Sequence, residues 1–215
     1  MNRTVVDRRS SVLGEIQLQQ RGIHYEIIYN GTFLMATYNG TSERKLVHTA
    51  LNTQHSPKRV LIGGLGVGFS VNEAVRSNDV KHVDVVEIDP WIIEWNRTYL
   101  KNVSNTSMDD PRVHVIQSDF LTWLSKAIEE TYDVICLDID NGPDWTVSTD
   151  NKALYTNTHL AQLAKLLKPG GAVSIWSAQE APWFEQALLK YFNKVQVIRT
   201  PVPRGDDDYI YLAVL

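Results

Sequence analysis

From residue 58 onward, short apolar runs alternate with longer amphipathic segments, and this alternation restricts the possible folds most. The runs KRVLIGG, HVDVVEID, RVHVIQSD, YDVICLDID and AVSIWSA are typical of buried strands. Helical patterns cover residues 68–77, 90–102, 120–130, 153–168 and 181–192. Repeated strand–helix units predict an α/β fold, a doubly wound and mostly parallel sheet with helices on both faces. The last two runs, KVQVIRT and YIYLAVL, predict an antiparallel hairpin at the sheet edge.

The residues before this region have a different pattern. EIQLQQ, IHYEIIY and TFLMATY are short and strand-like, and Asn30-Gly31 between the last two is a strong hairpin signal. A helix is expected after Ser42, which is a suitable N-cap. The sequence therefore predicts two units, an N-terminal tail and small β-hairpin segment over residues 1–40 and a catalytic domain over residues 41–215.

Composition and charge narrow the class of protein. A chain of 215 residues with 43% hydrophobic and 21% charged residues is typical of a soluble globular domain. The net charge of −4 gives no reason to expect nucleic acid or a membrane surface as partner. Cys136 is the single cysteine, which excludes an internal disulfide, and the six histidines show no metal-ligand spacing. The N-terminus lacks the pattern of a signal peptide, so a cytoplasmic location without a metal is expected.

Polar residues follow the predicted strands where ligands bind in open α/β sheets. Three alternating glycines, Gly64, Gly66 and Gly68, would let the backbone approach a ligand and present helix N-terminal amides. Glu87 ends the second strand and is placed to accept both hydroxyls of a ribose. Asp119, after the third strand, is placed to accept from an adenine amino group, to cap the helix that follows, or to do both.

In this order, VLIGGLGVG, VVEID, VIQSD, YDVICLDID and LLKPGGAVSIW resemble the class I S-adenosylmethionine-dependent methyltransferase fold. Within it, the chain is most similar to the spermidine/spermine synthase family and its short relatives, over roughly residues 15–215. The resemblance implies S-adenosylmethionine or its decarboxylated form as cofactor. The three glycines would line its methionine and ribose portion, Glu87 would hold the ribose, Asp119 the adenine, and Ile88 would pack on the adenine face. It also implies a homodimer with the N-terminal segment at the interface.

The loop after the fourth strand would hold the acceptor. Asp138 matches the acid that binds and deprotonates the amine in the polyamine synthases. The loop is shorter than in that family before Gly142-Pro143, so Asp140 matches the second acid only loosely. An alternative is that Asp140 belongs to the turn alone.

Two departures from the family bear on the transferred group. Val67 stands in the glycine turn where the polyamine synthases have an Asp that helps to hold the free amine of the decarboxylated cofactor. Ser42-Glu43-Arg44 falls near their Tyr-Gln-Glu segment, and Arg44 could pair with a carboxylate of cofactor or acceptor, or be a solvated helix residue. Both departures favour methyl transfer.

The leading hypothesis is therefore an S-adenosylmethionine-dependent methyltransferase acting on a small acceptor, an amine, with Asp138 as the base. The alternative is an aminopropyltransferase of the spermidine synthase type. A third reading is a cofactor-binding protein without catalysis, which the carboxylates at the site disfavour.

Aromatic residues near the loop are further candidates for the acceptor pocket. Trp145 and Trp176 could form its wall through cation–π attraction, although Trp176 could equally be core filler. The family resemblance implies an aromatic near Tyr155, which could also be only a helix-packing residue. The acidic run at 206–208 is expected to be a solvated turn; the alternative is that it attracts a cationic acceptor if the turn folds over the site.

Overall fold

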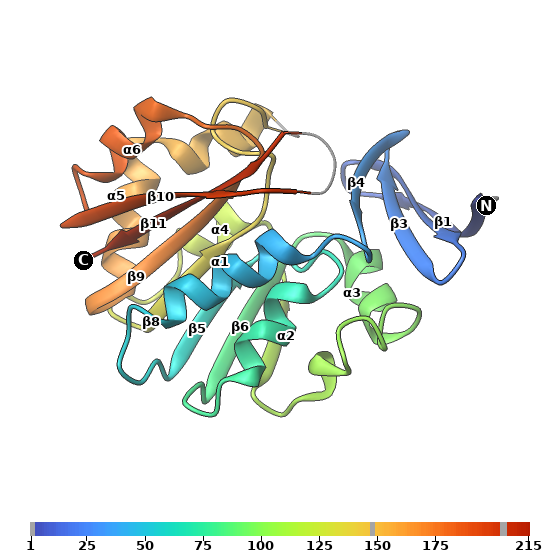
Figure 1. Ribbon diagram of the computed structural model, residues 1–215, viewed down its shortest axis with the longest axis horizontal. Helices are drawn as coiled ribbons and strands as arrows, with labels where there is room; N and C mark the ends of the chain where they lie inside the picture. Colours follow the sequence, from blue (N-terminus) through green and yellow to red (C-terminus); the bar gives the residue numbers. More distant parts are fainter. Residues whose placement is uncertain (1–2, 147–148, 203–205) are drawn as a thin grey trace.

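The computed structural model describes residues 3–146, 149–202 and 206–215, which form two sheets (Figure 1). The first sheet is antiparallel, in the order β1-β2-β3-β4. Its strands are β1 (Arg3–Ser11), β2 (Gly14–Arg21), β3 (His24–Tyr29) and β4 (Thr32–Ala36). The predicted hairpin is present as β3 and β4, with Asn30 and Gly31 both at positive φ in its turn. β1 was not predicted, because residues before Glu15 were read as a tail.

The second sheet confirms the predicted α/β class. Its order is β10-β11-β9-β8-β5-β6-β7, and β11 runs antiparallel to both of its neighbours while the pairs from β9 to β7 are parallel. The strands are β5 (Arg59–Gly63), β6 (His82–Glu87), β7 (Val113–Gln117), β8 (Tyr132–Leu137), β9 (Leu167–Ser177), β10 (Lys194–Thr200) and β11 (Asp208–Val214).

The helices are shorter than their apolar patterns suggest. They are α1 (Thr41–Leu51), α2 (Phe69–Arg76), α3 (Pro90–Arg97), α4 (Phe120–Leu124), α5 (Asn157–Leu166) and α6 (Pro182–Leu188), with 3-10 turns η1 (Ser107–Asp109) and η2 (Thr149–Tyr155). α5 ends early because Leu167 already pairs with Tyr132 as the first residue of β9. The N-cap prediction for Ser42 was wrong: Gly40 precedes α1, and Ser42 donates to the Glu43 carboxylate at 3.1 Å.

Alternate residues of each central strand enter opposite cores, as the two-residue period of a strand requires. Val60 and Ile62 of β5 pack with α1, α2 and α3, whereas Leu61 packs with α4, α5 and α6. Figure 1 shows α1 and α2 crossing the near face of the sheet. Both faces are therefore covered by helices, which explains why the strands are continuous apolar runs.

The N-terminal sheet docks against α3. The indole N–H of Trp91 donates to the Ser10 carbonyl at 2.9 Å, and that of Trp95 donates to the Asp7 carboxylate at 3.0 Å. From β3, the Tyr29 hydroxyl donates to Asp89 at 3.0 Å. Because Asp89 is also the N-cap of α3, these contacts connect the sheet to the segment that follows Glu87.

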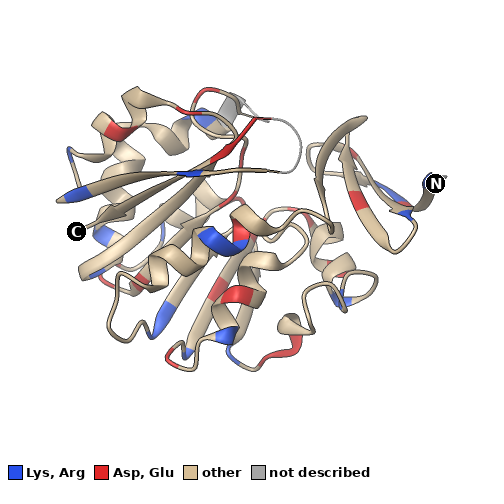
Figure 2. Cartoon of the chain, viewed as in Figure 1, with Lys and Arg blue, Asp and Glu red and all other residues tan. Residues whose placement is uncertain are grey.

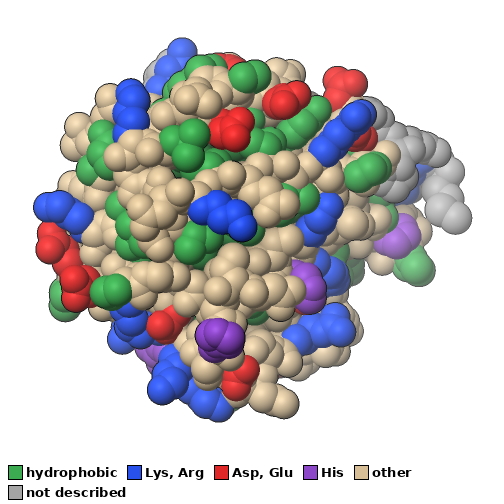
Figure 3. Space-filling view, turned by 60° about the vertical axis from the view of Figure 1, so that its left-hand side comes forward, with side chains coloured by type: hydrophobic (Ala, Val, Ile, Leu, Met, Phe, Trp, Pro, Cys, Tyr) green, Lys and Arg blue, Asp and Glu red, His purple; other side chains and the backbone are tan. Residues whose placement is uncertain are grey.

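Charges of both signs are interspersed on the surface shown in Figure 3. Among the described residues, no helix is both long and apolar enough to cross a bilayer.

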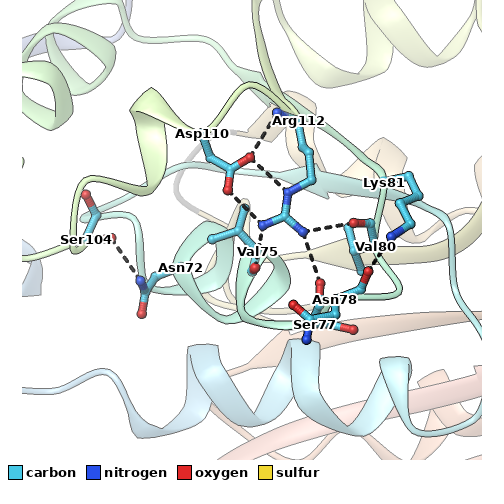
Figure 4. A network of polar contacts seen from close by, with 9 residues as sticks. All are labelled: Asn72, Val75, Ser77, Asn78, Val80, Lys81, Ser104, Asp110 and Arg112. Atoms are coloured by element: carbon cyan, nitrogen blue, oxygen red, sulfur yellow. Dashed lines mark hydrogen bonds and ion pairs between the residues drawn. The ribbon is translucent and has the colours of Figure 1, made fainter.

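Arg112, just before β7, holds the C-terminal end of α2 (Figure 4). Its guanidinium donates to the carbonyls of Val75 at 2.6 Å, Ser77 at 3.1 Å and Val80 at 2.9 Å. It also pairs with the Asp110 carboxylate at 2.7 Å, which raises the pKa of Arg112. A cation at this place satisfies carbonyls that the helix leaves free and interacts favourably with the helix dipole.

We expect Arg112→Met to lower the free energy of unfolding by about 2–4 kcal/mol, because several buried or half-buried carbonyls and Asp110 lose a charged donor. Arg97→Met, at an exposed position in α3, is the matched control and should change it by no more than about 0.5 kcal/mol. Urea denaturation of both variants gives the comparison, and equal effects would contradict the assigned role.

Candidate active site

The candidate site lies where β5 separates β6 from β8, the point at which the strand order of the sheet reverses. Here Asp138 N–H donates to the Gly63 carbonyl at 2.9 Å. A Cβ on Gly64 would lie 2.2 Å from the Asp138 carbonyl oxygen, and Gly64 has a φ of +88°. Only glycine fits this position, and the fit brings the glycine turn and the acidic loop directly together.

The rest of the glycine turn is held from two sides. Gly66 faces Met35 of β4, whose sulfur would lie 2.4 Å from an added Cβ. Gly68 packs against Asn96 and Ser104, and the Asn96 side chain donates to the Gly66 carbonyl at 2.7 Å. Gly64 and Gly66 keep part of their surface open, so the turn presents backbone on the side where a ligand would bind.

Glu87 fastens this turn to the end of β6. Its carboxylate accepts from Leu65 N–H and from Asp89 N–H, both at 2.8 Å, one at each oxygen. Burial raises the pKa of Glu87, and these backbone N–H groups oppose the rise. Each oxygen has a second acceptor position, so Glu87 can still receive two ribose hydroxyls. The residues thus fit the adenosine part of the cofactor predicted from the sequence.

Asp119 and Ile88 lie beside Glu87 at the ends of β7 and β6. Asp119 is the N-cap of α4 and accepts from Thr122 N–H at 2.7 Å, which confirms the capping interpretation. Ile88 is half-buried. Contact of either residue with an adenine stays a prediction.

Asp138 lies in a group of three carboxylates from distant parts of the chain. Loss of water raises its pKa well above the ordinary range, and repulsion from Glu43 and Asp208 adds to the rise. Burial likewise raises the pKa values of Glu43 and Asp208, and Asp208 acts on Glu43 as well. Asp138 remains partly accessible, whereas Glu43 and Asp208 are buried. An amine-binding base would occupy such a position.

Asp140 and Tyr155 lie on the other side of Asp138. Asp140 is buried and accepts from Asn141 N–H at 2.9 Å, so it contributes to the turn. Burial raises the pKa of Tyr155, and repulsion from Asp140 and, less strongly, from Asp138 adds to the rise. The Tyr155 phenol therefore lies near both acids. Tyr155 also packs edge-on against Phe184, with ring centroids 5.4 Å apart. Tyr155 is therefore a packing residue that lies near both acids, and its contact with an acceptor stays a prediction.

The other predicted acceptor residues are Trp176, Trp145 and Arg44. Trp176 is half-buried at the end of β9, opposite Ile210 of β11. Trp145 is 53% exposed and belongs to neither hydrophobic core. Arg44 lies over the Phe69 ring at 4.3 Å and donates to Asn72 at 3.3 Å, at the edge of a cavity of about 360 Å³. This cavity lies beside the glycine turn, and contact of Arg44 with cofactor or acceptor stays a prediction.

The sequence did not predict that Glu43 and Asp208 lie beside Asp138. The run at 206–208 was expected to be a solvated turn, but only its start is exposed: Asp208 begins β11 and is 9% exposed. Met35 and Asn96, which support the glycine turn, were also missed, because nothing in their local sequence indicates a contact with Gly66. The described residues contain no group of three His, Cys, Asp or Glu side chains placed to hold a metal ion.

The fold and the site define an α/β protein of the class I methyltransferase type. Residues 41–199 match the family model described as the spermine/spermidine synthase domain. The chain therefore belongs to the spermine/spermidine synthase family. Two solved spermidine synthases support the fold: one from Thermotoga maritima (TM-score 0.81, 23% identity, 98% of this chain and 72% of that one) and one in complex with the transition-state analogue AdoDATO (TM-score 0.82, 24% identity, 98% and 73%).

Two kinds of curated relative are similar in sequence. A polyamine aminopropyltransferase of Prochlorococcus marinus (strain MIT 9313) is 33% identical over 164 residues, which cover 76% of this chain and 54% of the relative. Putrescine N-methyltransferase 2 of Nicotiana tabacum is 31% identical over 147 residues, covering 67% and 39%. The chain spans about half or less of the length of such relatives.

The raised pKa of Asp138 gives a prediction about stability. Near pH 4 the carboxyl is protonated in the folded protein and about half protonated in the unfolded protein. As the pH rises the unfolded state ionises first, so the folded state loses stability. Asp138→Asn should therefore raise the free energy of unfolding by about 1–3 kcal/mol near pH 8, the usual cost of an uncompensated buried polar group, and by much less near pH 4.

Denaturant titrations at the two pH values measure this difference. Asp79→Asn removes a carboxylate at an exposed position and is the control. An Asp138→Asn variant that is destabilised at the higher pH would show that the carboxylate is compensated in the free protein.

Proposed function

We propose that this protein transfers an alkyl group from an adenosyl sulfonium to an amine, and that the group is the aminopropyl group of decarboxylated S-adenosylmethionine. The observation that supports this most is the position of Asp138, a carboxylate of raised pKa in direct backbone contact with the glycine turn. Family membership and the aminopropyltransferases among the relatives favour the aminopropyl group.

In this proposal the chain positions two reactants. Glu87 and the backbone of the glycine turn would hold the adenosine half of the sulfonium donor. When bound, this donor would supply the electrophilic carbon next to its sulfur. Asp138 binds the acceptor ammonium, takes one of its protons and aims the nitrogen at that carbon. A carbon–nitrogen bond forms, the carbon–sulfur bond breaks, and the electron pair stays on sulfur as a thioether. A base whose pKa is shifted toward neutrality suits the proton transfer.

Methyl transfer from intact S-adenosylmethionine is the second candidate, and Val67 favours it. Val67 is fully buried in the hydrophobic core, so position 67 offers no carboxylate to the free amine of the decarboxylated cofactor. The putrescine N-methyltransferases among the relatives are consistent with this alternative.

The thioether by-product distinguishes the candidates. Purified protein is incubated with each sulfonium and with a panel of primary amines, and the products are quantified by mass spectrometry. Aminopropyl transfer from decarboxylated S-adenosylmethionine leaves methylthioadenosine, which is the expected by-product. Formation of S-adenosylhomocysteine from intact S-adenosylmethionine would establish methyl transfer instead. Asp138→Asn should lower kcat about 10²–10⁴-fold, the usual contribution of a general base. Formation of neither thioether with any amine would support the third reading, a non-catalytic cofactor-binding protein.

We also propose that residues 1–40 form a dimerisation unit, that residues 41–215 form the catalytic domain, and that the homodimer acts in the cytoplasm. The family match begins at residue 41, and the first sheet leaves Val12, Ile23 and Phe33 largely exposed, at 61%, 84% and 51%. Sedimentation velocity would test the dimer.

A further inference from the structure

The segment between Glu87 and α3 is tied to the N-terminal sheet through one carboxylate. Asp89 is 1% exposed, and its backbone N–H donates to one oxygen of Glu87 at 2.8 Å. The Asp89 side chain caps α3 with one oxygen, which accepts from Trp91 N–H at 2.8 Å. Its other oxygen accepts from the Ser11 hydroxyl, and the Tyr29 hydroxyl lies 3.0 Å from the same oxygen. Asp89 therefore connects two hydroxyls of the N-terminal sheet with the predicted ribose site.

Ser11 and Tyr29 reach the same oxygen because the strand register puts them on one face of the N-terminal sheet. Ser11 of β1 lies opposite Gly14 of β2, and Tyr29 of β3 lies opposite Ile16 of β2. Opposite residues of an antiparallel pair point to the same face, and so do residues two positions apart in one strand. The two hydroxyl oxygens lie 2.5 Å apart, so they act on Asp89 as one group of donors.

Hydrogen bonds, and not a basic side chain, compensate the charge of Asp89. Figure 2 shows side chains of both charges on the N-terminal sheet, but no ion pair between the described residues includes Asp89. Burial and repulsion by Asp89 raise the pKa of Tyr29 to about 12, so its hydroxyl keeps its proton throughout the neutral range. A buried charged oxygen that loses its donors is costly. Loss of either hydroxyl should therefore displace the Asp89 carboxylate.

Other contacts hold the N-terminal sheet in place without these hydroxyls. The indole N–H of Trp91 donates to the Ser10 carbonyl at 2.9 Å. The indole N–H of Trp95 donates to the Asp7 carboxylate at 3.0 Å. Neither contact uses the Asp89 side chain. The sheet therefore stays docked when a hydroxyl is lost, and the change is confined to the position of Asp89.

The position of Asp89 matters because two backbone N–H groups fix the plane of the Glu87 carboxylate. Leu65 N–H binds one oxygen and Asp89 N–H binds the other, each at 2.8 Å. The second acceptor position of each oxygen then has a fixed direction, which the binding of two neighbouring hydroxyls requires. Such groups must be held to within about 10–20° by the residues behind them. A displaced Asp89 would turn one oxygen of Glu87 away from its ribose hydroxyl.

We propose that Ser11 and Tyr29 are positioning residues for the ribose site. Through Asp89 they orient the Glu87 carboxylate, and so they determine how strongly the protein prefers a nucleoside with both ribose hydroxyls over one that lacks a hydroxyl. The inference rests on the proposed function only in assigning the ribose to Glu87. Neither positioning residue needs to touch the ligand, because its effect passes through two hydrogen bonds in series.

Calorimetric titration with methylthioadenosine and with its 2′-deoxy analogue tests this inference without turnover. Wild type should bind methylthioadenosine at least about tenfold more tightly, the effect of one hydrogen bond to a charged group. Tyr29→Phe should weaken methylthioadenosine binding about tenfold and binding of the analogue about threefold or less, so that the preference falls about threefold or more. Tyr25→Phe makes the same change in the same strand, at a hydroxyl that bonds to none of the described residues, and should alter neither affinity.

Position 11 gives a second test with side chains of equal shape. Ser11→Thr keeps the hydroxyl, whereas Ser11→Val replaces it with a methyl group. Ser11→Val should lower the preference as Tyr29→Phe does, and Ser11→Thr should keep the preference of wild type. A purely structural role would weaken binding of both nucleosides by the same factor and leave the preference unchanged. If Tyr29→Phe fails to melt cooperatively, the two variants at position 11 decide in its place.

The outcomes separate this inference from the proposed function. If Tyr29→Phe and Ser11→Val keep the preference of wild type, the positioning role is wrong, whether or not the protein is a transferase. If both lower the preference but wild type forms neither thioether by-product with any amine, the positioning role stands and the proposed function is wrong. A wild type that binds the two nucleosides equally, or binds neither, would overturn the ribose site and the positioning role together, while detection of either thioether would still establish transfer.

Discussion

The close approach of the ends of β5 and β8 is the constraint on which the whole site depends. The Asp138 carbonyl lies so near to Gly64 that no side chain fits between them. The glycine turn follows β5 and the acidic loop follows β8, so both begin at this contact, on the same edge of the sheet. Glu87 then fixes the turn through Leu65. A sulfonium held on one side and an amine on the other would meet across a contact that the backbone itself makes rigid.

The sheet could be predicted because its strands are covered on both faces, which leaves continuous apolar runs in the sequence. The strand β1 of the N-terminal sheet could not be predicted from the sequence. β1 is mostly polar and exposed, and it is held by hydrogen bonds to Trp91 and Trp95, residues that no local pattern connects with it. Helix ends were misplaced for a related reason: Leu167 leaves α5 to pair with Tyr132, and this pairing overrides local helix propensity.

The two halves of the site differ in the same way. Each predicted cofactor residue lies at or just after the end of a parallel strand, so a local pattern together with one rule about sheet edges places it. Glu43 and Asp208 come from a helix and from an antiparallel strand, and only the packing of α1 over β11 brings them to Asp138. In sequence, Asp208 belongs to an acidic run, the pattern of a solvated turn. Its burial arises from the pairing of β10 with β11, which a charge pattern does not reveal.

The carboxylate group also connects stability with binding. Burial raises the pKa values of Glu43, Asp138 and Asp208, and repulsion between carboxylates adds to the rise for Glu43 and Asp138, so the folded protein keeps these protons to a higher pH than the unfolded chain does. A cationic ligand removes the repulsion and drives these protons out, so part of its binding free energy depends on pH. Affinity for an amine should therefore rise with pH until the amine itself begins to lose its charge. The burial that raises these pKa values lowers the stability of the fold at neutral pH, and a cation bound beside the carboxylates would recover part of that cost.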